Sequence, residues 1–553
     1  MRPTEHRESP IIPLSRFRAA LARPQGAKLV AALLEGRDPA AQVAALSATE
    51  LYLLVREVGL ADAGDLLALA TPEQFRGIVD IDAWTRDRLE ADKVLPWLAA
   101  LLDSGYERTT QMWERLDPEL SALLFARNTR IFDLSLGEDP DDEPADEALP
   151  VVRTPDTFFA VRITTEDAAT QAILMRLIDF LYRGDMQVAR HTLMAARSEP
   201  QSQLEEMSYR WRSGRLADLG YVEHYAALSI YELLDPEAIQ VGENSASVTG
   251  GGVRLPALFA GAIFGREFLA RALERITDAA DAERLEMALV VLVNHVLAAD
   301  AAQPGDAAAM ATAAERATAT LALGLETVAG GDLEVAAEAL RTVALSRLFR
   351  AGHTITVRLS HLATPFSLRA RALDDPAPAI VEALTARPRP AYPAVLDEPP
   401  QDGARAFSSA RDIARAAAAI ADIAARIAIA EAVGVDVAAI ARAEAPPFTA
   451  DTLVRTAILA AAWGRPLLPT PMAAADLPAI LTAVRVDGHL SPGARAAAEA
   501  ALQTAAEVAG AARAIPGLAA TIRGLIDSLE TAIASLDPAA IDPRFVAADL
   551  AIV

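Results

Sequence analysis

Short apolar runs, each opened by a helix-capping signal, repeat along the first part of the chain. Ser47 is followed three positions later by Glu50, and Thr71 is followed at the same spacing by Gln74. This spacing is typical of the capping box, in which two side chains satisfy two backbone amides at the start of a helix. Thr71 and Asp117 each precede a proline, which loses no hydrogen bond at the first helical position. The pattern predicts short stacked helices, an arrangement that usually provides a binding surface.

Helical periodicity continues through most of the remaining chain. In a later segment Ile173, Leu177 and Leu181 fall on one helical face. Residues 149–163 differ, because two apolar or β-branched runs flank a Pro-Asp turn and predict a β-hairpin. Residues 407–553 are rich in Ala and amphipathic, which is typical of a bundle of long helices. The predicted fold is therefore mostly α: stacked helical-repeat (superhelical) modules, a C-terminal Ala-rich helical bundle and one small β-hairpin.

Changes in composition divide the 553 residues into modules, as expected because so long a chain does not fold around one core. Residues 138–147 contain seven acids and two prolines, so they bury no core. We expect a disordered linker or flexible loop there, with a divalent-ion site as the functional alternative. The predicted segments are a polar N-terminal arm (1–26), a helical array (27–136), an acidic linker (137–148), a β-hairpin plus helical module (149–240), a helical module with a tetratricopeptide-like hairpin turned by Gly330, Gly331 and Asp332 (254–365), a Pro-rich linker (366–406) and the Ala-rich helical bundle (407–553).

Composition strengthens the prediction of helices and restricts the classes of partner. Hydrophobic residues make up 52% of the chain, but the excess is Ala, the best helix former, and aromatic residues are only 5%. The formal net charge of −24 argues against nucleic-acid binding and against docking on an anionic membrane, because both need clustered positive charge. The most apolar helical stretch, residues 413–440, carries a charged residue every one to two turns and does not fit a membrane span. These charged residues are Arg415, Asp422, Arg426 and Glu431.

Motifs for catalysis or cofactor binding are missing from the sequence. The chain has no cysteine, which removes disulfides, thiolate catalysis and cysteine-bound metal centres and fits a cytoplasmic location. None of the seven histidines forms the helical pair that a zinc or iron site requires. The glycines at 250–252 lack the Lys-Ser/Thr of a phosphate-binding loop, so a flexible connection is the simpler interpretation. We therefore predict no catalytic residue and no cofactor, except for a magnesium site considered below.

Three segments resemble a family of bacterial proteins known only as a domain of unknown function. The similarity lies in residues 51–59, 72–84 and 209–220, and the Gly-Gly-Asp turn at 330–332 agrees with it. The resemblance covers roughly the first 365 residues. Because known members have no assigned activity, it implies a family but no mechanism.

Residues 38–125 alone are also similar to the cytosolic N-domain of MgtE-type magnesium transporters, and the middle domain of the flagellar rotor switch protein is built in a related way. In the transporter this superhelix senses magnesium through acidic residues. The transporter function does not carry over, because the sequence offers no membrane segment. The resemblance leaves open whether acids of this array bind a divalent ion; helical arrays without metal are the alternative. The candidate magnesium ligands are Asp80, Asp82, Asp87 and Asp92.

Three arginines and two aromatic residues lie within seven positions of this acidic chain. Arginine binds phosphate or carboxylate in a bidentate manner and stacks on aromatic rings, so the segment predicts an anion or partner site. The alternative is a helix end whose Trp211 packs inward while the arginines pair with nearby acids, namely Glu205, Glu206 and Asp218. The candidate site residues are Tyr209, Arg210, Trp211, Arg212 and Arg215.

Three further tryptophans, Trp84, Trp97 and Trp113, lie in predicted helices beside apolar neighbours, where we expect them to anchor the core. Taken together, the sequence predicts a non-enzymatic cytoplasmic scaffold or adaptor that binds a protein partner through helical-repeat surfaces. The alternative is a regulatory module that responds to a divalent ion or small ligand, and an enzyme of unrecognised type comes third. Whether the C-terminal helices mediate self-association stays open.

Overall fold

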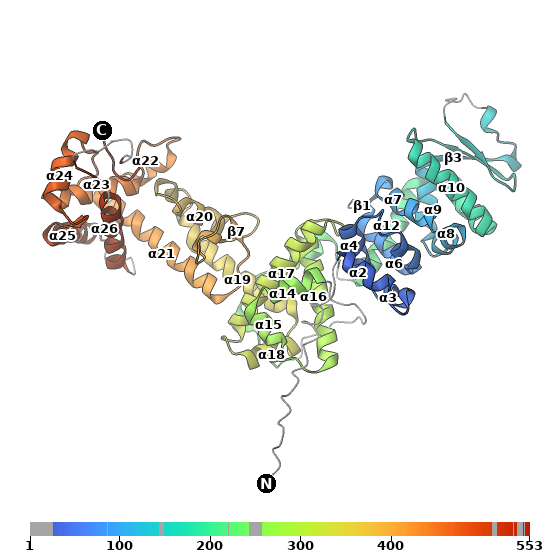
Figure 1. Ribbon diagram of the computed structural model, residues 1–553, viewed down its shortest axis with the longest axis horizontal. Helices are drawn as coiled ribbons and strands as arrows, with labels where there is room; N and C mark the ends of the chain where they lie inside the picture. The colour runs from blue at the N-terminus through green and yellow to red at the C-terminus, as the bar shows by residue number, and fades with distance from the viewer. Residues whose placement is uncertain are drawn as a thin grey trace, which may run out of the picture. The chain divides into compact units, whose positions relative to one another are not determined.

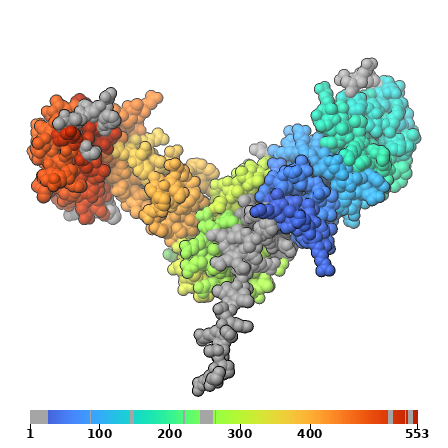
Figure 2. Space-filling view, in the orientation of Figure 1, coloured from blue at the N-terminus to red at the C-terminus, as the bar shows by residue number. Residues whose placement is uncertain are grey.

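A computed structural model describes residues 26–85, 87–142, 149–218, 221–242, 257–510, 517–534, 536–538, 546 and 548–553. The predicted N-terminal arm, the Gly-rich loop at 250–252 and the second half of the acidic segment lie outside these residues, apart from Gly26. The chain forms two compact units, Met1–Ala351 and Gly352–Val553. The first unit runs from blue to yellow-green and the second from yellow to red in Figures 1 and 2.

Helices dominate the described residues of both units, which confirms the predicted mostly α fold (Figure 1). Strands are short and belong to four small antiparallel sheets in this part of the chain. The first unit begins with short helices, as the cap signals predict. They are α2 (Gly26–Leu34), α3 (Pro39–Ala44), α4 (Ala48–Val58), α5 (Gly64–Leu69), α6 (Pro72–Asp82), α7 (Ala91–Asp103), α8 (Tyr106–Trp113) and α9 (Pro118–Asn128).

Both predicted capping boxes are present. At the start of α4, Ser47 Oγ accepts from the Glu50 amide at 3.1 Å, and the Glu50 carboxylate accepts from the Ser47 amide at 2.9 Å. At the start of α6, Thr71 and Gln74 form the same reciprocal pair. Gln74 also donates to the backbone oxygen of Val43 at 2.8 Å, so the cap of α6 is tied to α3. One residue thus satisfies a helix end and fixes a contact between helices.

Trp84 lies outside a helix, so the prediction that a helix contains this residue is wrong. It belongs to the two-residue strand β1 (Trp84–Thr85), which pairs with β2 (Arg88–Leu89). The Glu90 amide donates to the Ala83 carbonyl at 2.8 Å and closes this turn before α7 begins. Trp84 is nevertheless buried, as are Trp97 and Trp113.

The predicted hairpin is present and gains a third strand. β4 (Val151–Arg153) and β5 (Phe159–Ile163) are antiparallel, and β5 also pairs along its whole length with β3 (Thr129–Asp133). The predicted helical array (27–136) includes the residues of β3, but α9 ends at Asn128 and the chain continues as this strand. Thr129, Ile131 and Phe132 are β-branched or aromatic, and pairing with β5 favours the extended backbone.

Ion pairs hold the described part of the acidic segment to the rest of the first unit. Arg197 donates to Glu138 at 2.5 Å, and Arg153 lies 3.0 Å from both Asp139 and Asp141. Residues 140–142 form a short 3₁₀ helix, η2 (Pro140–Asp142). Glu138, Asp139 and Asp141 are therefore paired with arginines of the fold rather than set apart in a linker.

Helices of between 4 and 22 residues complete the first unit. The predicted Gly-Gly-Asp turn joins two of them: Gly330 and Gly331 have positive φ, and Asp332 accepts from the Glu334 and Val335 amides to cap the next helix. The helices are α10 (Ala168–Gly184), α11 (Met186–Ser198), α12 (Gln201–Asp218), α13 (His224–Ala227), α14 (Ala257–Phe264), α15 (Glu267–Leu273), α16 (Ala279–Ala299), α17 (Ala307–Val328), α18 (Leu333–Thr342) and α19 (Leu345–Ala363), which contains the boundary between the units.

The Pro-rich residues 366–406, expected as a linker, are folded within the second unit. They contain α20 (Ala377–Thr385) and the paired strands β6 (Tyr392–Pro393) and β7 (Ala404–Arg405). The Tyr392 ring is buried, lies 5.5 Å from the ring of Phe407 and carries the Arg405 guanidinium 4.1 Å from its centre. An aromatic residue with a stacked arginine thus organises a segment whose prolines alone predict an extended chain.

The remaining helices of the second unit pack on one another as a bundle. α23 and α25 are in contact, as are α21 and α25, and α26 contacts all three. The helices are α21 (Ala410–Val433), α22 (Val437–Arg442), α23 (Ala450–Ala462), α24 (Leu477–Val484), α25 (Pro492–Val508) and α26 (Leu518–Ala534), with a small pair of strands, β8 (Arg485–Val486) and β9 (His489–Leu490). Among the described residues, every helix is too short or too polar to cross a membrane.

Candidate functional site

The predicted arginine and aromatic residues all lie on one helix, α12, but on different faces of it. Leu204, Ser208, Arg212 and Leu216 recur every four residues and form the buried face. The segment therefore divides into residues that hold α12 in the first unit and residues that it presents to solvent.

Arg215 is the centre of an ion-pair cluster that joins α12 to two other helices. Its guanidinium donates to both carboxylate oxygens of Asp80, at 2.6 and 2.9 Å, and to both oxygens of Asp117, at 3.0 and 2.6 Å. Asp80 lies on α6, and Asp117 immediately precedes α9 without a capping hydrogen bond from its side chain. The side chains of these two acids are only 2% and 11% exposed. Hydrogen bonding to both acids outweighs burial and raises the pKa of Arg215 above its usual range.

Arg212 is buried beside this cluster. Its Nε donates to the Asp80 backbone oxygen at 2.7 Å, and its guanidinium lies 5.5 Å from the centre of the Trp84 ring. The ring of Tyr209 lies 6.0 Å from that of Trp84 on the same side of α12. Burial lowers the pKa of Arg212 to about 10, so the residue stays charged at neutral pH. Tyr209, Arg212 and Arg215 are thus occupied by contacts within the first unit.

Arg210 and Trp211 point the other way. Trp211 is 54% exposed, although a tryptophan on a helix in a folded core is normally covered. Arg210 is exposed and makes no hydrogen bond or ion pair with the described residues. Gly214 follows one turn later, and a Cβ placed on it would meet open space. We call Arg210, Trp211 and Gly214 the exposed face of α12.

The inward packing of Trp211 that the alternative interpretation required is therefore wrong. The pairing of the arginines is also different from that interpretation, because Arg212 and Arg215 contact residues more than 90 positions away in sequence. Glu205 instead pairs with Arg127 and accepts from the Leu89 amide at 3.0 Å. These contacts favour a structural role for the inner half of the segment and leave the outer half available for binding.

The four candidate magnesium ligands do not converge. Asp80 is bound by Arg215, and Asp82 accepts from the Tyr52 hydroxyl at 2.9 Å and from Trp97 Nε1 at 2.8 Å. Asp87 and Asp92 are exposed, and no group of three potential metal ligands occurs in the part of the chain that the structure describes. The geometry provides no support for a magnesium site at Asp80, Asp82, Asp87 and Asp92.

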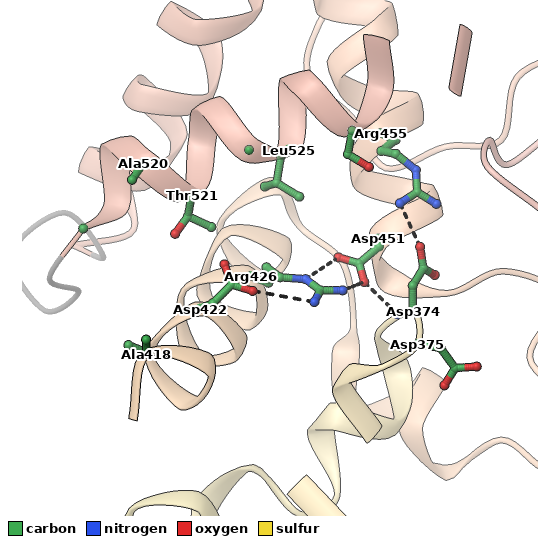
Figure 3. A pocket seen from close by; sticks show the side chains of 14 residues that line it. Asp374, Asp375, Ala418, Asp422, Arg426, Asp451, Arg455, Ala520, Thr521 and Leu525 are labelled. Atoms are coloured by element: carbon green, nitrogen blue, oxygen red, sulfur yellow. Dashed lines mark hydrogen bonds and ion pairs between the residues drawn. The ribbon is translucent and has the colours of Figure 1, made fainter. Parts of the chain in front are cut away.

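A second candidate site, missed in the sequence, is a cavity of about 600 Å³ in the second unit (Figure 3). Its walls come from α21, α23, α26 and the residues that precede α20. Arg426 on α21 lies between two acids: it donates to Asp451 on α23 and lies 3.7 Å from Asp422 on its own helix. Burial and the charge of Asp451 raise the pKa of Asp422 above its usual value, although the charge of Arg426 acts in the opposite direction.

A second ion pair completes this wall of the cavity. Arg455 lies 2.8 Å from Asp374, and the Asp374 amide donates to Asp451 at 2.7 Å, so the two pairs are connected (Figure 3). The neighbouring Asp375 is exposed and has no partner among the residues that the structure describes. The sequence signal for this site was the spacing of Asp422 and Arg426, one turn apart on an Ala-rich helix.

Comparison with known proteins adds a family but no function. The model of a family of unknown function, DUF6178, matches residues 6–550. This confirms the predicted resemblance to a family of unknown function, and the match extends well beyond residue 365. Neither the curated proteins nor the solved structures provide a match. The similarity of residues 38–125 to the magnesium transporter domain stays a prediction.

Proposed function

This chain belongs to the DUF6178 family, a family of unknown function, and we propose that it is a non-enzymatic scaffold or adaptor that binds a protein partner through the exposed face of α12. The observation that carries the proposal is the 54% exposure of Trp211. Tryptophan and arginine are the residues most enriched among those that dominate binding energy at protein interfaces. Burying the indole against a partner would remove a large apolar surface from water.

The charges on this face favour an acidic partner group. Arg210 lies next to Trp211 and is not neutralised by any described residue. A carboxylate from a partner would find both a bidentate donor and an adjacent aromatic ring. We therefore propose a partner that presents an acidic side chain beside an apolar pocket.

The inner half of α12 supports this function by fixing the helix. Arg215 is bound to Asp80 and Asp117, and Arg212 is bound to the backbone of α6. A helix that is held on one face presents its other face without further ordering, and less conformational entropy is lost on binding. The absence of cysteine fits a reducing compartment, and we propose that the protein acts in the cytoplasm.

Affinity purification of the tagged full-length protein from its own host tests the proposal. A Trp211→Ala/Arg210→Ala variant should lose a partner that the parent protein retains, with affinity reduced at least about 30-fold. The matched control is Leu136→Ala/Arg183→Ala, which removes an exposed apolar residue and an exposed arginine elsewhere in the first unit. Equal recovery of every partner by both variants would contradict the proposal.

A further inference from the structure

The cavity in the second unit has the size of a small-molecule site. Its volume of about 600 Å³ lies within the range of ligand pockets, and helices from three parts of the chain line it. Figure 3 shows Asp422 and Arg426 on α21 across from Thr521 and Leu525 on α26. The cavity is independent of α12, which belongs to the first unit.

The charges that line the cavity are unbalanced. Four aspartates and two arginines contribute to the lining. Each arginine is engaged by one acid in particular, Arg426 by Asp451 and Arg455 by Asp374. The two acids that remain are Asp422, whose nearest cation is 3.7 Å away and already bound to Asp451, and Asp375. The lining therefore contains two more acids than arginines: Asp422 shares Arg426 with Asp451, and Asp375 has no ion pair among the described residues.

A metal ion does not fit this arrangement as well as an organic cation. A divalent ion needs several oxygen ligands that converge on one point, and no group of three acids or histidines does so among the described residues. The walls are also partly apolar, since Ala418, Ala421 and Leu525 lie between the charged groups. Methylene groups suit such walls, and ammonium groups suit the two unbalanced carboxylates.

We propose that this cavity binds a small aliphatic diamine, with one ammonium group at Asp422 and the other at Asp375. The hydroxyl groups of Thr521 and Ser528, which also line the cavity, provide further hydrogen-bond acceptors for these ammonium groups. Binding at this site would give the protein a response to small cationic metabolites that is separate from its partner surface.

Calorimetric titration of the full-length protein with 1,4-diaminobutane tests the proposal. Saturable binding of one diamine per chain is expected, whereas the uncharged 1,4-butanediol and magnesium chloride should give none. Asp422→Asn and Asp375→Asn should each weaken the affinity about tenfold or more, because each removes one charge-assisted hydrogen-bond partner. The control is Asp476→Asn, which removes an exposed acid of the same unit outside the cavity and should bind like the parent protein.

A variant that blocks the cavity distinguishes loss of diamine binding from loss of folding. Thr521→Lys places a tethered ammonium group in the cavity and should abolish diamine binding while the circular dichroism spectrum stays unchanged. Absence of saturable diamine binding to the parent protein would overturn the proposal, as would equal weakening by Asp476→Asn or undiminished binding to Thr521→Lys. The Trp211→Ala/Arg210→Ala variant should bind diamine normally, so failure of this inference and failure of the adaptor proposal are distinguishable.

Discussion

The cluster around Arg215 provides the sharpest prediction of stability. Arg215→Leu removes four hydrogen bonds to Asp80 and Asp117 and leaves an Asp80 side chain that is only 2% exposed without its cation. Removal of one partner from a buried ion pair costs about 3–5 kcal/mol, because the remaining charge stays desolvated. We expect the free energy of unfolding of the first unit to fall by about this amount.

Urea denaturation followed by tryptophan fluorescence measures this change, since Trp84 lies beside Arg212 next to the cluster. The matched control is Arg210→Leu, the same substitution on the exposed face of α12, which should change stability by about 0.5 kcal/mol or less. Adding Asp80→Asn to Arg215→Leu removes the unpaired charge and should recover about 1–2 kcal/mol. Equal stabilities of the Arg215→Leu and Arg210→Leu variants would refute the structural role of the cluster.

Two other predictions concern stability elsewhere in the chain. Gly184→Ala should lower the free energy of unfolding by about 1–3 kcal/mol in urea denaturation, because a Cβ there would lie 2.6 Å from the Thr110 Cβ. The control is Gly214→Ala, where a Cβ meets open space, and it should not destabilise the protein. Equal losses of stability in the two variants would contradict this packing. In the second unit, burial and the charge of Arg389 lower the pKa of His353 to about 4. Between about pH 6.5 and 4 the unfolded chain therefore binds more protons than the folded chain. The free energy of unfolding should decrease as the pH is lowered through this window, by up to about 1.4 kcal/mol per pH unit. An unchanged pH dependence of stability in His353→Gln would contradict the assignment.

Features that depend on neighbouring residues were predictable from the sequence. The capping boxes at Ser47 and Thr71, the turn before Asp332 and the hairpin of β4 and β5 all follow from signals within a few positions. The third strand, β3, was not predictable in this way. The sequence pattern predicts helix for its residues, because they continue the helical array. Only their pairing with β5, about 30 positions away, selects the extended backbone.

The candidate sites show the same limit. The sequence identified the arginine and aromatic segment of α12 but not which residues face inward, because Asp80 and Asp117 are 135 and 98 positions from Arg215. A four-residue spacing did carry part of the answer, since Arg212 falls in register with the apolar Leu204 and Leu216. Four separate segments of the chain line the cavity of the second unit. One of them lies in the Pro-rich residues 366–406, which the sequence predicts to be a linker.

Site-specific photo-crosslinking tests the central claim, partner binding by the exposed face of α12, most directly. A photoreactive amino acid at the exposed positions of Glu206 or Asp218, which flank Trp211 on the same helix, should crosslink one defined partner in living cells. The same probe at Glu267, an exposed position on α15, serves as the control. The account predicts a partner adduct from α12 that disappears with Trp211→Ala. An adduct pattern identical at all three positions, or one that is unaffected by Trp211→Ala, would contradict it.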